Sequence, residues 1–124
     1  MEAASTRFPV RTRAFQISVE DVPTEFLLNG YSNRILVVAT QTGTFGTVLQ
    51  AKAEPSFDGE TTFSVSTLMG KRDEEELTIC ARRIIESAAQ QGCNKPFTIC
   101  LGAKRLTLKG VKSIVDAVLE NRVW

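Results

Sequence analysis

The sequence contains no histidine, and this absence removes much of the chemistry that enzymes use. Histidine is the commonest general base near neutral pH, the usual partner of a nucleophilic serine or cysteine, and a frequent ligand of transition metals. Carboxylates and lysines can still move protons, so the absence disfavours catalysis without excluding it. We therefore expect a non-enzymatic protein that has no catalytic residues, no cofactor and no metal site.

Cysteine is scarce and does not form a recognisable framework. The three cysteines, Cys80, Cys93 and Cys100, are odd in number, and their spacing matches neither a disulfide framework nor a paired zinc motif. Cys80 and Cys100 fall on apolar positions and are predicted to be small core residues, whereas Cys93 falls in a predicted turn that is open to solvent. Free thiols imply a reducing compartment, so we expect a cytoplasmic protein, with the nucleus open as a second location.

Long apolar runs and a strong net charge are also missing. The longest apolar run, Ile35 to Ala39, is far shorter than the roughly 18 to 20 residues that cross a bilayer. With 15 basic and 14 acidic residues the net charge is +1, so no overall field attracts nucleic acid or anionic lipid. We expect neither nucleic acid nor membrane as a partner.

The overall composition of the chain is that of one folded domain. The chain has 124 residues, of which 43% are hydrophobic and 23% charged. Alternating apolar residues begin at Thr12, so we predict a flexible N-terminal extension over residues 1–11 and a single domain over residues 12–124.

Alternation of apolar and polar residues predicts six strands. Five come before any helix and one follows the first helix; they cover residues 12–20, 24–31, 35–39, 45–53, 61–69 and 95–101. Val22 and Pro23 are predicted to separate the first two strands. The turn residues Gln41 to Thr44 predict that the third and fourth strands form a hairpin.

Helical periodicity appears in two segments. In the first, Asp73 is predicted as the N-cap, with Glu76 three residues later, and Gly92 as the end. A second helix is predicted to start near Thr107. The apolar stripes of the two helices are Leu77, Cys80, Ala81, Ile84, Ile85 and Ala88 in the first and Leu108, Val111, Ile114, Val115, Val118 and Leu119 in the second.

The element order βββββαβα predicts an α/β protein of the α+β type, with a mostly antiparallel six-stranded sheet that carries both helices on one face. Strands lie about 4.8 Å apart, so six of them make a sheet about 25 to 29 Å wide. Two helices of about 10 Å diameter each cover one face of such a sheet and no more. The second face is left without cover inside the chain.

The third predicted strand is apolar on both sides, which normally means burial on both sides. Leu36 and Val38 share one side, and Leu27 lies on the side of its own strand opposite Phe26. We predict that the chain dimerises through the uncovered face into a sheet sandwich flanked by helices, with Leu27, Leu36 and Val38 in the interface. Two alternatives stay open: the odd-numbered neighbours form the interface, or the sheet curls until its own edges and loops cover the patch.

Several short motifs occur in order along the chain: Ile35-Leu36-Val37-Val38, Thr40-Gln41, Gly43, Gly46-Thr47, Leu68-Met69-Gly70 and the terminal Val123-Trp124. In this order they resemble the proteasome assembly chaperone 3 family, from about Thr24 to Trp124. The resemblance implies a non-enzymatic chaperone that pairs through its sheet with a related small chaperone, as a heterodimer, or with itself, as a homodimer. It also implies that the pair binds proteasome α-type subunits and promotes assembly of the α ring of the core particle.

Two loops at the ends of predicted strands are the expected contacts with partners. One is the turn that contains Gln41, Gly43, Phe45 and Gly46. The other is the polar loop from Glu54 to Glu60, whose Phe57 has no obvious core to enter and is followed by Asp58. Their role is predicted from position alone.

Two other functions are compatible with the sequence. Lys71 and Arg72 precede the acidic start of the first helix, which is a suitable place to bind a phosphorylated metabolite, as a binding domain or as a small enzyme. The chain is also compatible with a scaffold dimer in an unrelated complex.

Overall fold

The computed structural model describes residues 10–70, 74–103 and 105–124. These ranges hold six strands and two helices in the predicted order: β1 (Arg11–Val19), β2 (Val22–Gly30), β3 (Ile35–Thr40), β4 (Thr47–Pro55), β5 (Thr61–Met69), α2 (Glu75–Gln90), β6 (Phe97–Gly102) and α3 (Leu108–Glu120). Neither helix in the described ranges is long and apolar enough to cross a membrane.

The strands form one sheet in the spatial order β1-β2-β3-β6-β4-β5. Four of the five neighbouring pairs are antiparallel and one, β3 with β6, is parallel, so the mostly antiparallel sheet is confirmed. The predicted hairpin of the third and fourth strands is wrong, because β6 lies between β3 and β4. The segment 41–46 instead passes over the end of β6, where a Cβ on Gly46 would lie 2.3 Å from the carbonyl oxygen of Leu101.

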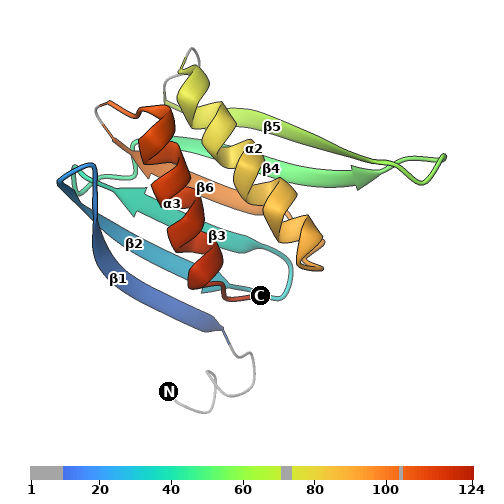
Figure 1. Ribbon diagram of the computed structural model, residues 1–124. Coiled ribbons are helices and arrows are strands. Elements are labelled where there is room, and N and C mark those ends of the chain that lie inside the picture. The colour runs from blue at the N-terminus through green and yellow to red at the C-terminus, as the bar shows by residue number, and fades with distance from the viewer. Residues whose placement is uncertain (1–9, 71–73, 104) are drawn as a thin grey trace.

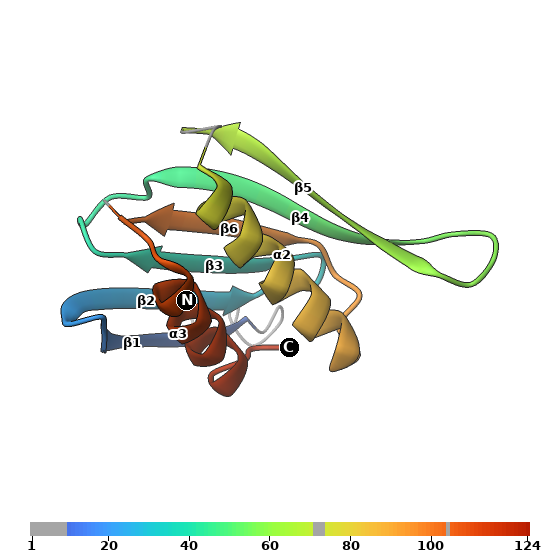
Figure 2. The same cartoon turned by 45° about the horizontal axis from the view of Figure 1, so that its top comes forward.

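Both helices pack on the same face of the sheet, as predicted (Figures 1 and 2). Alternation along the strands decides which side chains meet them. In β3 the odd-numbered residues Ile35, Val37 and Ala39 belong to the helix-facing core, whereas Leu36 and Val38 lie on the other face. The remaining sheet residues of that core are Val19, Phe26, Leu28, Leu49, Ala51, Phe97, Ile99 and Leu101.

The turn between β1 and β2 also anchors the start of α3. Glu20 and Asp21 have φ of 51° and 66° and form the turn, so Val22 and Pro23 belong to β2 rather than to the predicted break. The N-cap of α3 is Thr107, whose hydroxyl accepts from the N–H of Gly110 at 3.1 Å and donates to the carboxylate of Glu20. The last helix is thereby held against one end of the sheet.

The N-cap residue of α2 is Glu74. Asp73, for which the sequence predicts that role, lies outside the described residues, as do Lys71 and Arg72.

The three cysteines are free and buried. Cys80 lies in the helix-facing core, as predicted. Cys93 is only 6% exposed, so the expectation of an exposed thiol is wrong. Its N–H donates to the carbonyl of Ala88 at 2.9 Å, which folds the residue back under the end of α2. Cys100 is buried as well, but on the sheet face that carries no helix.

Candidate protein-interaction surfaces

The sheet face opposite the helices, called the open face below, carries a continuous line of apolar side chains. The strand register places one such residue from each strand directly beside the next. We call this line the apolar row; across the sheet it consists of Ala14, Leu27, Val38, Cys100, Val48 and Met69. Two of the three residues predicted for a dimer interface, Leu27 and Val38, belong to the row, and the third, Leu36, lies beside it.

The centre of the apolar row is shielded by its own neighbours, and its ends are not. Val38 and Cys100 are 6% and 5% exposed although no helix covers them. Leu27 and Val48, on either side of them, are half-buried, and Met69 at the β5 end is 63% exposed. The centre of the row is therefore buried within the single chain, whereas Leu27, Val48 and Met69 stay accessible to a partner.

One of the two lines of open-face residues beside the apolar row is uncharged and mostly polar, and the line on the other side contains Glu25. In register across the sheet it runs Thr12, Asn29, Leu36, Thr98, Gln50 and Ser66. Thr12 and Asn29 are joined by a hydrogen bond of 2.9 Å between their side chains. An apolar centre next to uncharged polar groups is the composition typical of the middle of a protein interface, where charged residues are depleted.

The hairpin of β4 and β5 extends beyond the rest of the sheet (Figures 1 and 2). β4 pairs with β6 only between Thr47 and Ala51, whereas its pairing with β5 continues to Pro55 and Thr61. We call the projecting part, residues 52–64, the arm. It is a two-stranded ribbon with no third strand beside it.

The tip of the arm is shaped by its own hydrogen bonds. The N–H of Ser56 donates to the carbonyl of Glu60 at 2.8 Å, and the N–H of Glu60 donates to Asp58 Oδ1 at 3.2 Å. The hydroxyl of Ser56 donates to the Asp58 carboxylate, and this bond, with the backbone bond from Glu60, lowers the pKa of Asp58. Asp58 therefore holds the turn, and Phe57 projects fully exposed from it.

The loop 41–46 lies at the other end of β4 from the arm tip. The N–H of Gln41 donates to the carbonyl of Gly102 at 2.7 Å, and its side-chain amide donates to Thr24 at 3.2 Å. Gly43 and Gly46 have φ of 78° and 67°, which favour glycine. Gln41 and the glycines thus fix the loop, and Phe45, 64% exposed, is the side chain that it presents.

The structure does not bring the two predicted contact loops together. The nine residues of β4 separate them, which is a distance of about 30 Å at roughly 3.3 Å per residue. A partner that contacts both Phe45 and Phe57 must therefore span the length of the sheet.

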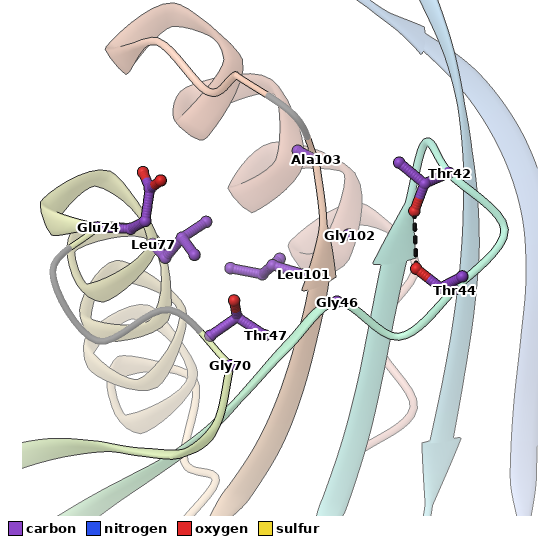
Figure 3. A pocket seen from close by; sticks show the side chains of 10 residues that line it. All are labelled: Thr42, Thr44, Gly46, Thr47, Gly70, Glu74, Leu77, Leu101, Gly102 and Ala103. Atoms are coloured by element: carbon purple, nitrogen blue, oxygen red, sulfur yellow. Dashed lines mark hydrogen bonds between the residues drawn. The ribbon is translucent and has the colours of Figure 1, made fainter.

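A cavity of about 380 Å³ opens beside the loop 41–46, where β6 ends and α2 begins (Figure 3). Glu74 is the one charged residue among the described residues that line it. Lys71 and Arg72, the residues predicted to bind a phosphorylated metabolite, lie outside the described residues. The cavity's lining is Thr42, Thr44, Gly46, Thr47, Gly70, Glu74, Leu77, Leu101, Gly102 and Ala103.

Metal-ligand clusters and cysteine thiols are two kinds of reactive group that can be assessed in the described part of the chain. No three Cys, Asp or Glu side chains gather there as potential metal ligands. Burial raises the pKa of the Cys80 thiol to about 12, and burial also raises the pKa of Cys100, so neither forms a reactive thiolate near neutral pH.

Four residues of the apolar row escaped the sequence prediction: Ala14, Val48, Met69 and Cys100. Each is a single apolar residue among polar neighbours or is indistinguishable from a core residue. Only the register between strands places them beside Leu27 and Val38. Alternate residues of a strand lie on the same face of the sheet, and this alternation identifies the open-face residues once the strand order is known.

Comparison with known proteins gives consistent results. A family model described as proteasome assembly chaperone 3 matches residues 37–121. Two relatives named proteasome assembly chaperone 3, from Bos taurus and Homo sapiens, are 29% and 26% identical over 105 residues; each alignment covers 83% of this chain and 85% of the relative. The fold is similar to a chain in a solved structure described as "Crystal Structure of a Novel Chaperone Complex for Yeast 20S Proteasome Assembly". That match has a TM-score of 0.70 at 12% identity, and covers 89% of this chain and 97% of the other.

Proposed function

Because the chain belongs to the proteasome assembly chaperone 3 family, we propose that it is a non-enzymatic chaperone of proteasome assembly. In this proposal it forms a dimer with a related small chaperone or with itself, and the dimer binds proteasome α-type subunits. The dimer promotes assembly of the α ring in the cytoplasm or nucleus. The observation that carries the proposal, beyond family membership, is the apolar row on the open face.

The open face suits a second sheet stacked about 10 Å away. A second sheet would cover Leu27, Val48 and Met69, which are accessible in the single chain. Burial of apolar surface contributes about 25 cal/mol per Å², so these side chains supply a driving force for pairing. The uncharged line that contains Asn29 and Gln50 adds no charge on its side of the apolar row.

The arm supplies a second surface, for the α-type subunit. Phe57 is a fully exposed aromatic on a turn that hydrogen bonds hold in shape, so little conformational entropy is lost when it enters a pocket. Glu54, Asp58 and Glu60 outnumber Lys52 on the arm. We expect Phe57 to enter an apolar pocket whose rim carries lysine or arginine.

The test is to recover a tagged copy of the chain from cell extract and to identify the proteins that accompany it. The proposal expects α-type proteasome subunits together with a small partner chaperone, or a second copy of the chain. A Leu27→Asp bait should lose the small partner, because it places a carboxylate in the apolar row. Recovery of neither α-type subunits nor a small partner would contradict the proposal, and a small partner within an unrelated complex would favour a scaffold dimer.

The metabolite-binding alternative has its own test. A specific ligand raises the melting temperature by mass action, so a thermal-shift series with phosphorylated metabolites and nucleotides separates the two functions. We expect no shift. A saturable shift that is lost in Lys71→Ala would favour the alternative.

A further inference from the structure

The two edges of the sheet differ in how their sequences protect them. β1 and β5 are the outer strands. β1 carries Arg11 and Arg13, whereas β5 has nine residues, Thr61–Met69, without a charged residue or a proline. Sheet edges in natural proteins are usually protected by charge, proline, short length or a bulge, because an open edge pairs with other strands. A register shift between Val48 and Leu49 disturbs β5 pairing only near its end.

The hydrogen bond at the arm tip shows which backbone groups of β5 point outward. The N–H of Ser56 donates to the carbonyl of Glu60, so these two residues form a hydrogen-bonded pair. Hydrogen-bonded and non-hydrogen-bonded pairs alternate in an antiparallel ladder. Counting along the register, Phe63 opposite Ala53 and Val65 opposite Ala51 are non-hydrogen-bonded pairs. The N–H and C=O groups of Phe63 and Val65 therefore point away from β4.

One of these outward groups is occupied by a side chain from α2. The guanidinium of Arg82 donates to the carbonyl oxygen of Phe63 at 3.2 Å. The Arg82 side chain is exposed, and a hollow of about 370 Å³ lies between Thr61 and Phe63 of β5 and the last turns of α2. Arg82 is a removable cover, because one hydrogen bond at the surface is worth little against a ladder of backbone bonds.

We propose that β5 is a strand-pairing edge whose partner is the β5 strand of a second copy of this chain, and that Arg82 limits this pairing by occupying the Phe63 carbonyl. The β5 sequence is complementary to itself. In an antiparallel pair centred on Val65, Ser64 faces Ser66 of the second copy and no charged residue of β5 faces another. The arginines on β1 make the opposite edge a poorer choice.

This edge is distinct from the open face, so the two interfaces are independent. The proposal rests on the strand edge and does not require the proposed chaperone function. A chain that used both interfaces at once would build an open polymer, because two separate two-fold contacts do not close on each other. By occupying part of the β5 edge, Arg82 therefore keeps a dimer that is paired through the open face from assembling into a polymer.

The test compares Arg82→Ala with Arg83→Ala by sedimentation over a concentration series. The two arginines are adjacent and both exposed on α2, but only Arg82 has a hydrogen bond to β5 in the described structure. Both variants are made in the Leu27→Asp background, so that pairing through the open face does not contribute. We expect Arg82→Ala to tighten self-association by about tenfold, which corresponds to about 1.4 kcal/mol, and Arg83→Ala to leave it unchanged.

A second variant and a second measurement identify the edge. Adding Val65→Pro to Arg82→Ala should abolish the gain, because proline removes an outward N–H while the ladder bonds to β4 remain. Circular dichroism confirms that the variant is folded. Hydrogen exchange should show the Val65 amide exchanging fast in the single chain and slowly in the Arg82→Ala dimer. Equal association of the two arginine variants, or association that survives Val65→Pro in a folded chain, would overturn the proposal.

Discussion

Two adjacent valines of β3 provide a matched test of the two sheet faces. Val37 is fully buried against the helices, and Val38 lies on the open face beside Leu27 and Cys100. The changes Val37→Asp and Val38→Asp are chemically identical and occur in the same strand. Any difference between them reports only which face of the sheet receives the carboxylate.

The two costs are expected to differ severalfold. At Val37 the change loses about 1.5 to 3 kcal/mol of apolar burial and leaves a carboxylate among core side chains, which costs several kcal/mol more. Because a domain of this kind has about 5 to 15 kcal/mol of stability in total, Val37→Asp should not fold. At Val38, which is 6% exposed, the change loses a similar amount of apolar burial. No helix of the described chain covers this side chain, so the carboxylate can turn toward solvent, and we expect a cost of about 1.5 to 3 kcal/mol without the further penalty.

The assay combines circular dichroism with sedimentation equilibrium on purified protein. We expect the original chain to sediment as a dimer, with itself or with its partner. Val38→Asp should keep the far-ultraviolet spectrum of the original chain but sediment as a monomer. Two results would refute the reasoning. If Val38→Asp unfolds as completely as Val37→Asp, the open face is internal core; if it folds and still dimerises, the dimer uses another surface.

Three further predictions follow from local geometry. Gly46→Ala should lower the melting temperature much more than Gly43→Ala. Both residues have positive φ, but a Cβ on Gly46 would lie 2.3 Å from a β6 carbonyl oxygen, whereas a Cβ on Gly43 would meet nothing within 4 Å. Equal losses of melting temperature would contradict the loop geometry. Burial raises the pKa of Cys80 from 9.0 to about 12, so the folded state holds this proton longer, and Cys80 should lower the free energy of unfolding by about 1.4 kcal/mol per pH unit between those values. The fall should be less steep in Cys80→Ala than in the original chain, and equal slopes in the two chains would contradict this. Phe57→Ser should weaken recovery of α-type subunits from extract without changing the dimer. The control is Leu108→Ser, because Leu108 on α3 is also a large apolar residue, 60% exposed, and this change should affect neither. Equal effects of the two changes would contradict a special role of the arm.

The elements and the layer structure could be predicted from the sequence because they depend on local periodicity. Every strand and helix of the described residues was predicted, and β5 has the predicted bounds. The double-sided apolarity of β3, with Leu36 and Val38 opposite Val37, predicted an uncovered apolar face, and the structure has one. These features follow from periods of 2 and 3.6 residues, which a single segment shows by itself.

The strand order could not be predicted, because it depends on a pairing between segments far apart in the chain. β6 enters between β3 and β4, although the composition of residues 41–46 is as suitable for a hairpin as for a crossing loop. For the same reason the sequence could not show which residues of the two predicted contact loops are exposed and which hold the loops in shape. Gln41 and Gly46 hold a loop in place, and Asp58 holds a turn, so Phe45 and Phe57 are the exposed side chains of the predicted set.

The sequence of β3 alone does not determine which of its two apolar sets faces the helices. A slip of one residue would exchange Val37 with Val38 and move one apolar set from the core to the open face. Because β3 is apolar on both faces, its sequence pattern does not disfavour this slip.

Contacts at the two ends of β3 disfavour the slipped register. At one end the N–H of Ile35 donates to the carbonyl of Pro96 at 3.0 Å, and at the other the N–H of Gln41 donates to Gly102 at 2.7 Å. A Cβ at Gly102 would lie 2.6 Å from the carbonyl oxygen of a residue in the crossing loop, so a shifted strand would force that loop into β6. The close-packed glycines thus determine which apolar set is left for a partner.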